Sequence, residues 1–85
     1  MGGIILFKNK NADGSLNISG AYIAKLRKER QLSQRALADK LQLEGVDLNK
    51  NAIQQIECGQ RFVTDIELKA FAQFFDISSN DLLNL

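Results

Sequence analysis

The feature of this sequence that most limits its fold is a succession of short amphipathic segments that begin at helix-capping residues. Ser19, Ser33, Thr64 and Ser78 each carry a side-chain oxygen that can accept a hydrogen bond from the free N–H groups at the start of a helix. Behind the first three, apolar residues recur at intervals of three or four, which is the spacing of one face of an α-helix. The chain contains no proline. The pattern predicts an all-α fold.

The first two predicted helices follow Ser19 and Ser33. Ile18 stands where it can pack against the first helix as a hydrophobic staple, and that helix is expected to end near Gln31. The small Ala38 would let another helix approach the second one closely. The residues expected to face the interior are Tyr22, Ile23 and Leu26 in the first helix and Leu37, Ala38 and Leu41 in the second.

A third helix is predicted from about Lys50 to Cys58, with Ile53 and Ile56 inward. Gly59 follows it and can take the left-handed conformation that ends a helix. The preceding stretch, residues 42–49, contains Gly45 as a natural turn residue. Its apolar side chains Leu43, Val46 and Leu48 are expected to contact the core.

Two further helices are predicted near the C-terminal end. Thr64-Asp65-Ile66-Glu67 has the form of a capping box, in which the threonine and the glutamate each bond the other's backbone N–H. Ser78 is expected to cap a last short helix. The inward residues are Leu68, Phe71, Ala72 and Phe75 in the fourth helix, and the fifth ends in Leu82 and Leu83.

The organisation expected from these segments is one compact five-helix domain preceded by an arm. A chain of 85 residues has room for a single core. Residues 1–17 differ from the rest: Gly3 to Phe7 is interpreted as a short strand or a sticky arm, and Lys8 to Asn17, rich in turn formers, as a loop. Residues 18–85 would form the domain.

Composition excludes several classes of function. The chain has no histidine and one cysteine, Cys58, which removes the usual metal ligands, the commonest general base and any intramolecular disulfide. No cofactor, metal site or catalytic residue is therefore expected, and Cys58 is interpreted as a half-buried residue at a helix end. The longest apolar run, Ile4 to Phe7, is too short to span a membrane, which favours a cytoplasmic protein.

Charge is distributed unevenly along the chain. Residues 1–61 contain ten Lys and Arg against six Asp and Glu, whereas residues 62–85 contain one lysine against four acids. A basic region suits a polyanionic partner such as nucleic acid, although clustering of surface charge by chance is the alternative.

Three stretches of the chain carry a resemblance to a known family. They are Tyr22-Ile23-Ala24-Lys25-Leu26-Arg27, then Leu32-Ser33-Gln34-Arg35-Ala36-Leu37-Ala38, and Ile53-Gln54-Gln55-Ile56-Glu57-Cys58-Gly59. Together with the closing Phe75-Asp76-Ile77 and Asp81-Leu82-Leu83, they resemble the phage-repressor helix-turn-helix domains known as Xre or Cro-like. The resemblance covers Ser19 to Leu83 and implies a five-helix, lambda-repressor-like fold that binds double-stranded DNA.

The chain departs from that family pattern at one place. Between Leu41 and Leu48 it has six residues, whereas the usual pattern has about one. The turn of the motif is therefore an extended loop, Gln42 to Asp47. Val46 and Leu48 suggest that the loop folds back onto the core, and its tip could add a contact to DNA.

The resemblance implies that the surface of the third helix reads bases in the major groove. Its outward candidates are Lys50, Asn51, Gln54 and Gln55. Asparagine and glutamine can pair with two atoms of adenine, and lysine can donate to guanine. The alternative is that these are ordinary exposed helix residues.

The resemblance also implies contacts with the DNA backbone. Gln34 stands at the start of the second helix, where free N–H groups favour a phosphate. Arg35 and Arg61 are the further candidates for phosphate binding. Arg27 is expected instead to form a structural ion pair, for instance with Glu57.

Two classes of function follow from these observations. The first is a sequence-specific transcriptional regulator, most simply a repressor, that binds a pseudo-palindromic site as a homodimer through its C-terminal apolar residues Phe74, Leu83 and Leu85 or through the arm at residues 4–7. The second is an antitoxin-like or adaptor protein whose main role is to bind a protein partner. No enzymatic activity and no membrane partner are expected.

Overall fold

The structure, a computed structural model, describes residues 10–84. Among these residues it contains five helices and no strand, as the sequence predicted: α1 (Gly20–Glu29), α2 (Gln34–Leu43), α3 (Lys50–Glu57), α4 (Asp65–Phe75) and α5 (Ser79–Leu83). The strand or arm expected at Gly3 to Phe7, and the apolar Leu85, lie outside the described residues.

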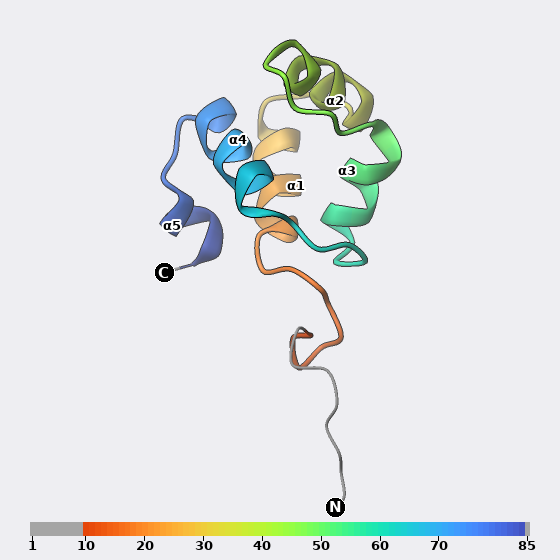
Figure 1. The fold of residues 1–85 in the computed structure, drawn as a ribbon, viewed down its shortest axis with the longest axis vertical. Coiled ribbons are helices and arrows are strands. Elements are labelled where there is room, and N and C mark those ends of the chain that lie inside the picture. The colour runs from red at the N-terminus through yellow and green to blue at the C-terminus, as the bar shows by residue number, and fades with distance from the viewer. Residues whose placement is uncertain (1–9, 85) are drawn as a thin grey trace, which may run out of the picture.

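The helices surround a single core. Helix α3 packs against α1 and α2, and α4 packs against α2 and α5, so that α3 lies at one side of the molecule and α5 at the other (Figure 1). The buried apolar residues come from all five helices and from the loop before α3. They are Ile23, Leu37, Ala38, Leu41, Leu48, Ile53, Ile56, Ala70, Phe71, Ala72, Phe75 and Leu82. The inward stripes predicted for the helices are confirmed, with Tyr22, Leu26 and Leu68 half-buried at the edge of the core.

Most of the predicted caps are confirmed. Ser33 Oγ accepts from the Ala36 N–H, Ser78 Oγ accepts from the Asp81 N–H, and Thr64 and Glu67 form the complete capping box. Helix α3 is capped by Asn49, whose side chain accepts from the Ala52 N–H. Each cap satisfies an N–H that has no partner within the helix, which is why these positions begin helices.

The prediction for the start of α1 is wrong in two respects. Ser19 precedes the helix but its side chain makes no capping hydrogen bond, and Ile18, expected to pack as a staple, is 57% exposed. The cap is supplied by Asn17, whose Oδ1 accepts from the Gly20 N–H at 2.8 Å. The reason is the backbone of Ser19, which already has helical torsion angles (φ −84°, ψ −15°) and therefore cannot turn its side chain back over the helix start.

Helices α1, α2 and α3 end in the same way, with a left-handed residue and two backbone hydrogen bonds of the Schellman type. In α2, Gly45 has φ +86°, its N–H donates to the Gln42 carbonyl, and the Val46 N–H donates to the Leu41 carbonyl. This turn directs Val46 against the core and brings Leu48 to full burial, so the extended loop does fold back onto the domain. Leu43 was expected to join them and does not, because it is 88% exposed on the outer side of the turn.

The ends of α3 and α1 lie at or near the residues predicted from the sequence. Gly59, with φ +77°, ends α3 as predicted. Helix α1 ends at Glu29, two residues earlier than the predicted Gln31, because Gln31 itself takes the left-handed conformation with φ +58°.

Candidate nucleic-acid interface

Helix α3 presents two chemically different sides. Ile53 and Ile56 are fully buried. At about 100° per residue, the four predicted base-reading residues occupy one continuous arc of roughly 140° on the opposite side, and all four are exposed: Lys50, Asn51, Gln54 and Gln55. The structure therefore places the whole predicted set on one accessible face of one short, rigidly packed helix.

The side chains on this face are little used inside the protein. Among the described residues, those of Lys50, Asn51 and Gln55 form no hydrogen bond or ion pair, and Gln54 donates only to Cys58 Sγ, at 3.1 Å. Cys58 is exposed rather than half-buried as predicted, because it lies at the C-cap, where the helix turns away from the core. The donors and acceptors of the arc are thus available to a ligand.

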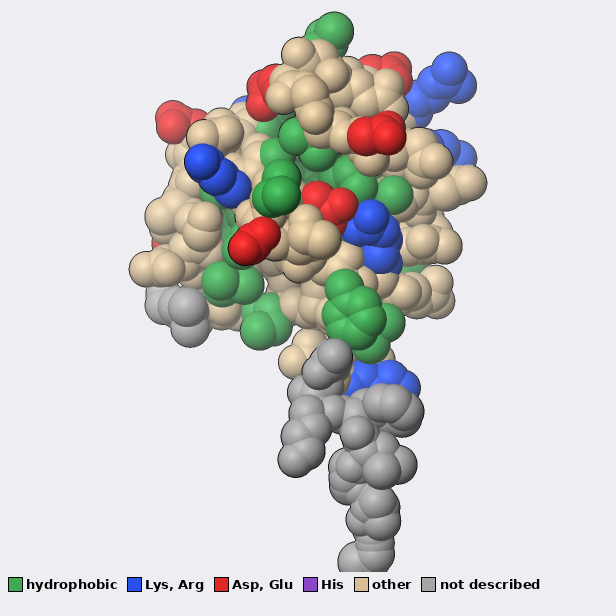
Figure 2. Space-filling model, viewed as in Figure 1, with side chains coloured by type: hydrophobic (Ala, Val, Ile, Leu, Met, Phe, Trp, Pro, Cys, Tyr) green, Lys and Arg blue, Asp and Glu red, His purple; other side chains and the backbone are tan. Residues whose placement is uncertain are grey.

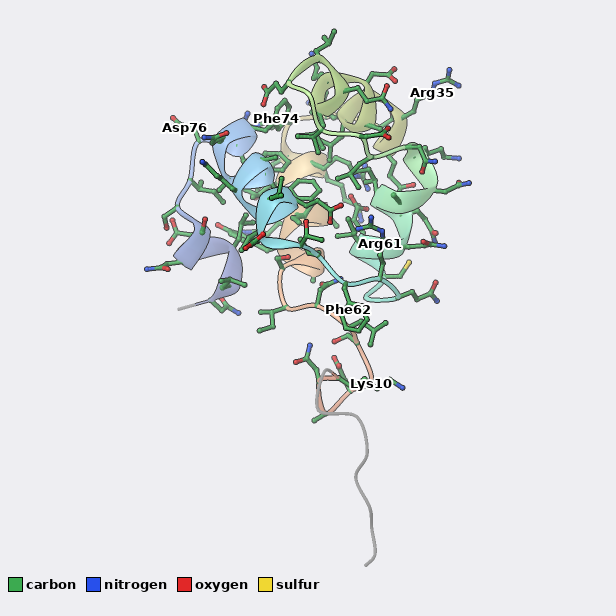
Figure 3. The ribbon with its side chains drawn as sticks, in the orientation of Figure 1. Lys10, Arg35, Arg61, Phe62, Phe74 and Asp76 are labelled. Carbon is green, nitrogen blue, oxygen red and sulfur yellow. The ribbon has the colours of Figure 1, made fainter. Side chains whose placement is uncertain are left out.

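One side of α2 faces the start of α3. Arg35 and Lys50 line the two sides of a shallow notch between these helices, together with Asp39 and Asn49. Figure 3 shows Arg35 extending into solvent from α2 on the side of the molecule where α3 lies. Arg35 and Lys50 therefore place two cations beside this notch, where they would attract phosphate groups, while the carboxylate of Asp39 opposes them.

Gln34, the other predicted phosphate ligand on α2, is half-buried and already has one partner. Its Nε2 donates to Glu57 Oε1 at 3.0 Å. One N–H of the same amide remains, so Gln34 can still donate to a phosphate while Glu57 holds its orientation.

The predicted ion pair of Arg27 with Glu57 is present and buried. Arg27 Nε and Nη2 donate to the two carboxylate oxygens at 2.7 and 2.9 Å, and Nη1 donates to the Leu32 carbonyl at 2.8 Å. The side chains are only 11% and 7% exposed. The hydrogen bonds that Arg27 donates to Glu57 raise the pKa of Arg27 above its ordinary value, although burial opposes this. Glu57 thereby links α1, the start of α2 and the end of α3.

Arg61 is engaged within the protein. Its guanidinium donates two hydrogen bonds to the Glu67 carboxylate, at 2.9 and 3.1 Å, and a third at 3.0 Å to the Phe62 carbonyl. Figure 3 shows the Arg61 side chain directed back between α3 and α4. The carboxylate that it contacts is the one that completes the Thr64 capping box. Arg61 is therefore not a free cation like Arg35, and a phosphate would have to compete with Glu67 for it.

Sequence reasoning missed the residue that holds the end of α3. The Asn17 amide donates to the Ile56 carbonyl at 2.9 Å and to the Arg61 carbonyl at 2.8 Å, while its oxygen caps α1. It reaches both because α1 begins against the end of α3: a Cβ at Gly20 would lie 2.0 Å from the Ile56 oxygen. The pair Asn17 and Gly20, three residues apart before an apolar helix, was the available signal, but Ser19 offered the more usual cap.

This arrangement of a supporting helix, an extended turn and a second helix with an exposed polar face defines a helix-turn-helix protein. The profile of the family described as "Helix-turn-helix domain" matches residues 20–85. The chain belongs to this family, in agreement with its resemblance to the Xre and Cro-like domains, and thus to a class of DNA-binding domains associated with transcription regulation. Comparison with the curated proteins and with the solved structures gives no significant match. In the part of the chain described by the structure, no helix has the length and apolar character needed to cross a membrane.

Proposed function

We propose that this protein binds double-stranded DNA sequence-specifically by inserting α3 into the major groove, and that it acts in the cytoplasm as a repressor of transcription. The observation that supports this most directly is the outward arc of α3, which is exposed, polar and almost unused in internal hydrogen bonds. A major groove about 12 Å wide admits one α-helix. A helix with two fully buried isoleucines behind it would enter the groove as a rigid element.

The proposed base contacts come from the four residues of the arc. Asn51, Gln54 and Gln55 would pair with adenine through their amides, and Lys50 would donate to guanine. Arg35 and the second N–H of Gln34 would bind phosphate groups beside the groove. Arg61 would contribute to phosphate binding only by exchanging the Glu67 carboxylate for a phosphate oxygen.

The proposed DNA site has two-fold symmetry and is bound by two copies of the chain. A single module of this size buries limited surface on DNA, whereas specific binding at physiological salt commonly needs about 1,000 Å² or more of protein surface. Two half-sites one helical turn apart, about 34 Å, would double the contact.

Selection of DNA from a randomised duplex pool at about 0.15 M salt, followed by sequencing, tests this function. The expected result is an enriched motif made of two inverted half-sites, and loss of its enrichment with Gln55→Ala. Placing the selected site over the promoter of a reporter gene should lower expression when the protein is present.

Retention of DNA that carries no enriched motif and disappears as salt rises would contradict the proposal. Only phosphate contacts would then exist, and binding of a protein partner would become the better account of the fold.

A further inference from the structure

Residues 11–17 form a folded segment that precedes the residues matched by the family profile, which begin at residue 20. The Asn11 N–H donates to the Ser15 carbonyl at 2.9 Å, and the Asn11 amide donates to Ser15 Oγ at 2.8 Å and to the Asn17 carbonyl at 2.9 Å. The Ser15 hydroxyl donates to Asp13 Oδ1 at 2.7 Å. Figure 1 shows the segment below the start of α1, and Figure 2 shows exposed hydrophobic side chains at the same end of the domain. The segment is therefore a turn with its own internal hydrogen bonds.

This segment is fastened to the C-terminal end of α3. The Asn17 amide donates to the Ile56 carbonyl at 2.9 Å and to the Arg61 carbonyl at 2.8 Å. The Leu16 N–H donates to the Gly59 carbonyl at 2.8 Å. Ile56 lies in the last turn of α3, and the other two carbonyls lie in the loop that follows. Three hydrogen bonds thus connect the segment before α1 to the backbone that ends α3.

The contact made by Asn17 differs in kind from the others that hold α3. Ile53 and Ile56 are fully buried and fix the inner side of the helix, and Glu57 connects its end to α1 and α2 through a side chain. Asn17 instead binds the backbone, at the Ile56 carbonyl, which points out of the end of the helix along its axis. The start of α1 abuts the same carbonyl, since a Cβ at Gly20 would collide with its oxygen. These contacts oppose a shift of α3 along its axis.

The base-reading residues nearest to this contact are Gln54 and Gln55. Gln55 directly precedes Ile56 in the chain, so a shift of the Ile56 backbone moves Gln55 with it. A hydrogen bond forms over a donor–acceptor range of only about 2.7–3.2 Å, so a displacement of about 1 Å at Gln55 would break a paired contact between its amide and adenine. Lys50 lies at the opposite end of α3, beside the Asn49 cap, and depends less on this contact.

We propose that Asn17 is a positioning residue for DNA binding: the hydrogen bonds from its amide to the Ile56 and Arg61 carbonyls hold Gln55 in place against the base that it reads. Asn17 itself is half-buried and acts through the position of α3, without touching DNA. The inference rests on the proposed function. It adds that the unit which reads DNA begins before residue 20, in a segment that lies outside the family match.

A double-mutant cycle measured on the selected DNA site tests this inference. Asn17→Ser has no amide, but its hydroxyl oxygen can cap α1 by the same bond, to the third following N–H, that Ser33 makes in α2. In the wild-type background, Gln55→Ala should weaken binding about ten-fold. In the Asn17→Ser background it should weaken binding less than about three-fold, because the contact of Gln55 is already largely lost. Asn17→Ser alone should weaken binding about three-fold or more.

Two controls separate positioning from a general loss of stability. Lys50→Ala, at the other end of α3, should weaken binding by the same factor in both backgrounds, to within about two-fold. Ser78→Ala removes the cap of α5, a helix that packs against α4, and should leave the full effect of Gln55→Ala in place. A Ser78→Ala background that reduces the effect of Gln55→Ala as much as Asn17→Ser does would overturn the inference.

Two further variants keep the test decisive. Asn11→Ala removes the exposed amide that bonds the Asn17 carbonyl and serves if Asn17→Ser does not fold; it should reduce the effect of Gln55→Ala to about five-fold. Gln54→Ala provides a second cycle with the same expected coupling. Effects that multiply independently in both cycles, or no effect of either glutamine variant on the wild type, would overturn the inference. Absence of specific binding by the wild type to any DNA site would instead overturn the proposed function itself.

Discussion

Two sets of polar side chains on and around α3 differ sharply in their surroundings. On the outward arc, Lys50, Asn51 and Gln55 are exposed and form no side-chain hydrogen bond among the described residues. At the other side, Glu57 accepts from both Arg27 and Gln34 and is almost fully buried. The same helix thus carries residues that bind within the protein and residues whose polar groups remain exposed. The comparison teaches that the residue type does not decide the role: within residues 10–84 the Arg35 side chain forms no hydrogen bond or ion pair, whereas Arg61 is bonded to Glu67.

The largest expected effect on stability comes from substituting Glu57 in the buried set. Glu57→Ala would leave the Arg27 guanidinium buried without its charge partner, which costs about 3 kcal/mol or more of unfolding free energy. Urea unfolding measures this directly. The matched control is Glu29→Ala, which removes an exposed ion pair with Lys25 and should change stability by less than about 0.5 kcal/mol. Equal effects of the two variants would contradict the assignment of Glu57 to the structure.

A somewhat smaller loss is expected from Asn17→Ala. The variant removes two hydrogen bonds that tie the segment before α1 to the end of α3 and the loop after it, together with the cap of α1, and it leaves the Ile56 and Arg61 carbonyls short of a donor. A loss of about 2 kcal/mol is expected. Asn51→Ala, on the exposed arc of α3, should leave the urea midpoint unchanged, and a similar loss in that variant would show that the arc also supports the fold.

Substitutions in the exposed set should weaken DNA binding and leave the stability of the fold unchanged. Gln55→Ala is expected to weaken binding to the selected DNA by about 1–2 kcal/mol, because a base contact is lost, while thermal unfolding stays the same. Gln73→Ala, an exposed glutamine on α4, serves as the control in the same titration. If both variants bind as the wild type does, Gln55 reads no base.

The smallest expected effect is on the loss of stability at low pH, through the carboxyl group of Glu67. Burial raises the pKa of this carboxyl group, but hydrogen bonds from Arg61 and from the Thr64 N–H outweigh it, so that the pKa lies below its ordinary 4.5. The pKa of Glu67 is lower in the folded protein than in the unfolded chain, so the ionised carboxylate stabilises the fold at pH values above its ordinary pKa. This stabilisation is lost as the pH falls from the ordinary pKa towards the folded pKa. Between pH 6 and pH 3, Glu67→Gln should therefore lose less stability than the wild type, by up to about 1 kcal/mol. An identical acid dependence of the two proteins would contradict this.

Much of the fold could be predicted because helix signals are local. The periodicity of the apolar residues and the capping residues together predicted all five helices, and the serine and threonine caps at Ser33, Thr64 and Ser78 were predicted correctly because each acts within three residues of itself. The prediction for Ser19 failed because Asn17, whose amide also donates to the distant carbonyls of Ile56 and Arg61, caps α1 instead. The prediction for Leu43 failed because the turn at Gly45 directs Val46 rather than Leu43 against the core.

The candidate site likewise has a part that could be predicted from the sequence and a part that could not. The outward arc of α3 was predictable, because the buried Ile53 and Ile56 leave only one side of a helix to face solvent. The partners of Gln34 and Arg61 were not predictable, since Glu57 approaches Gln34 from another helix and Glu67 was already assigned to a cap. Arg27 and Glu57 are thirty residues apart, and their pairing was expected only as one example of a structural ion pair.

By itself, the sequence determined the number and approximate bounds of the helices, most residues of the core and the polar face of α3, because these depend on spacing along a helix and on neighbours within one turn. Only the tertiary structure decided which cations are occupied, that Asn17 fastens the segment before α1 to the end of α3, and that Leu16, Ile18 and Phe62 form one groove. Those features need residues that are distant in the chain to meet at hydrogen-bonding or van der Waals distance. Such meetings are set by how the packed helices place their ends, and no local pattern records them.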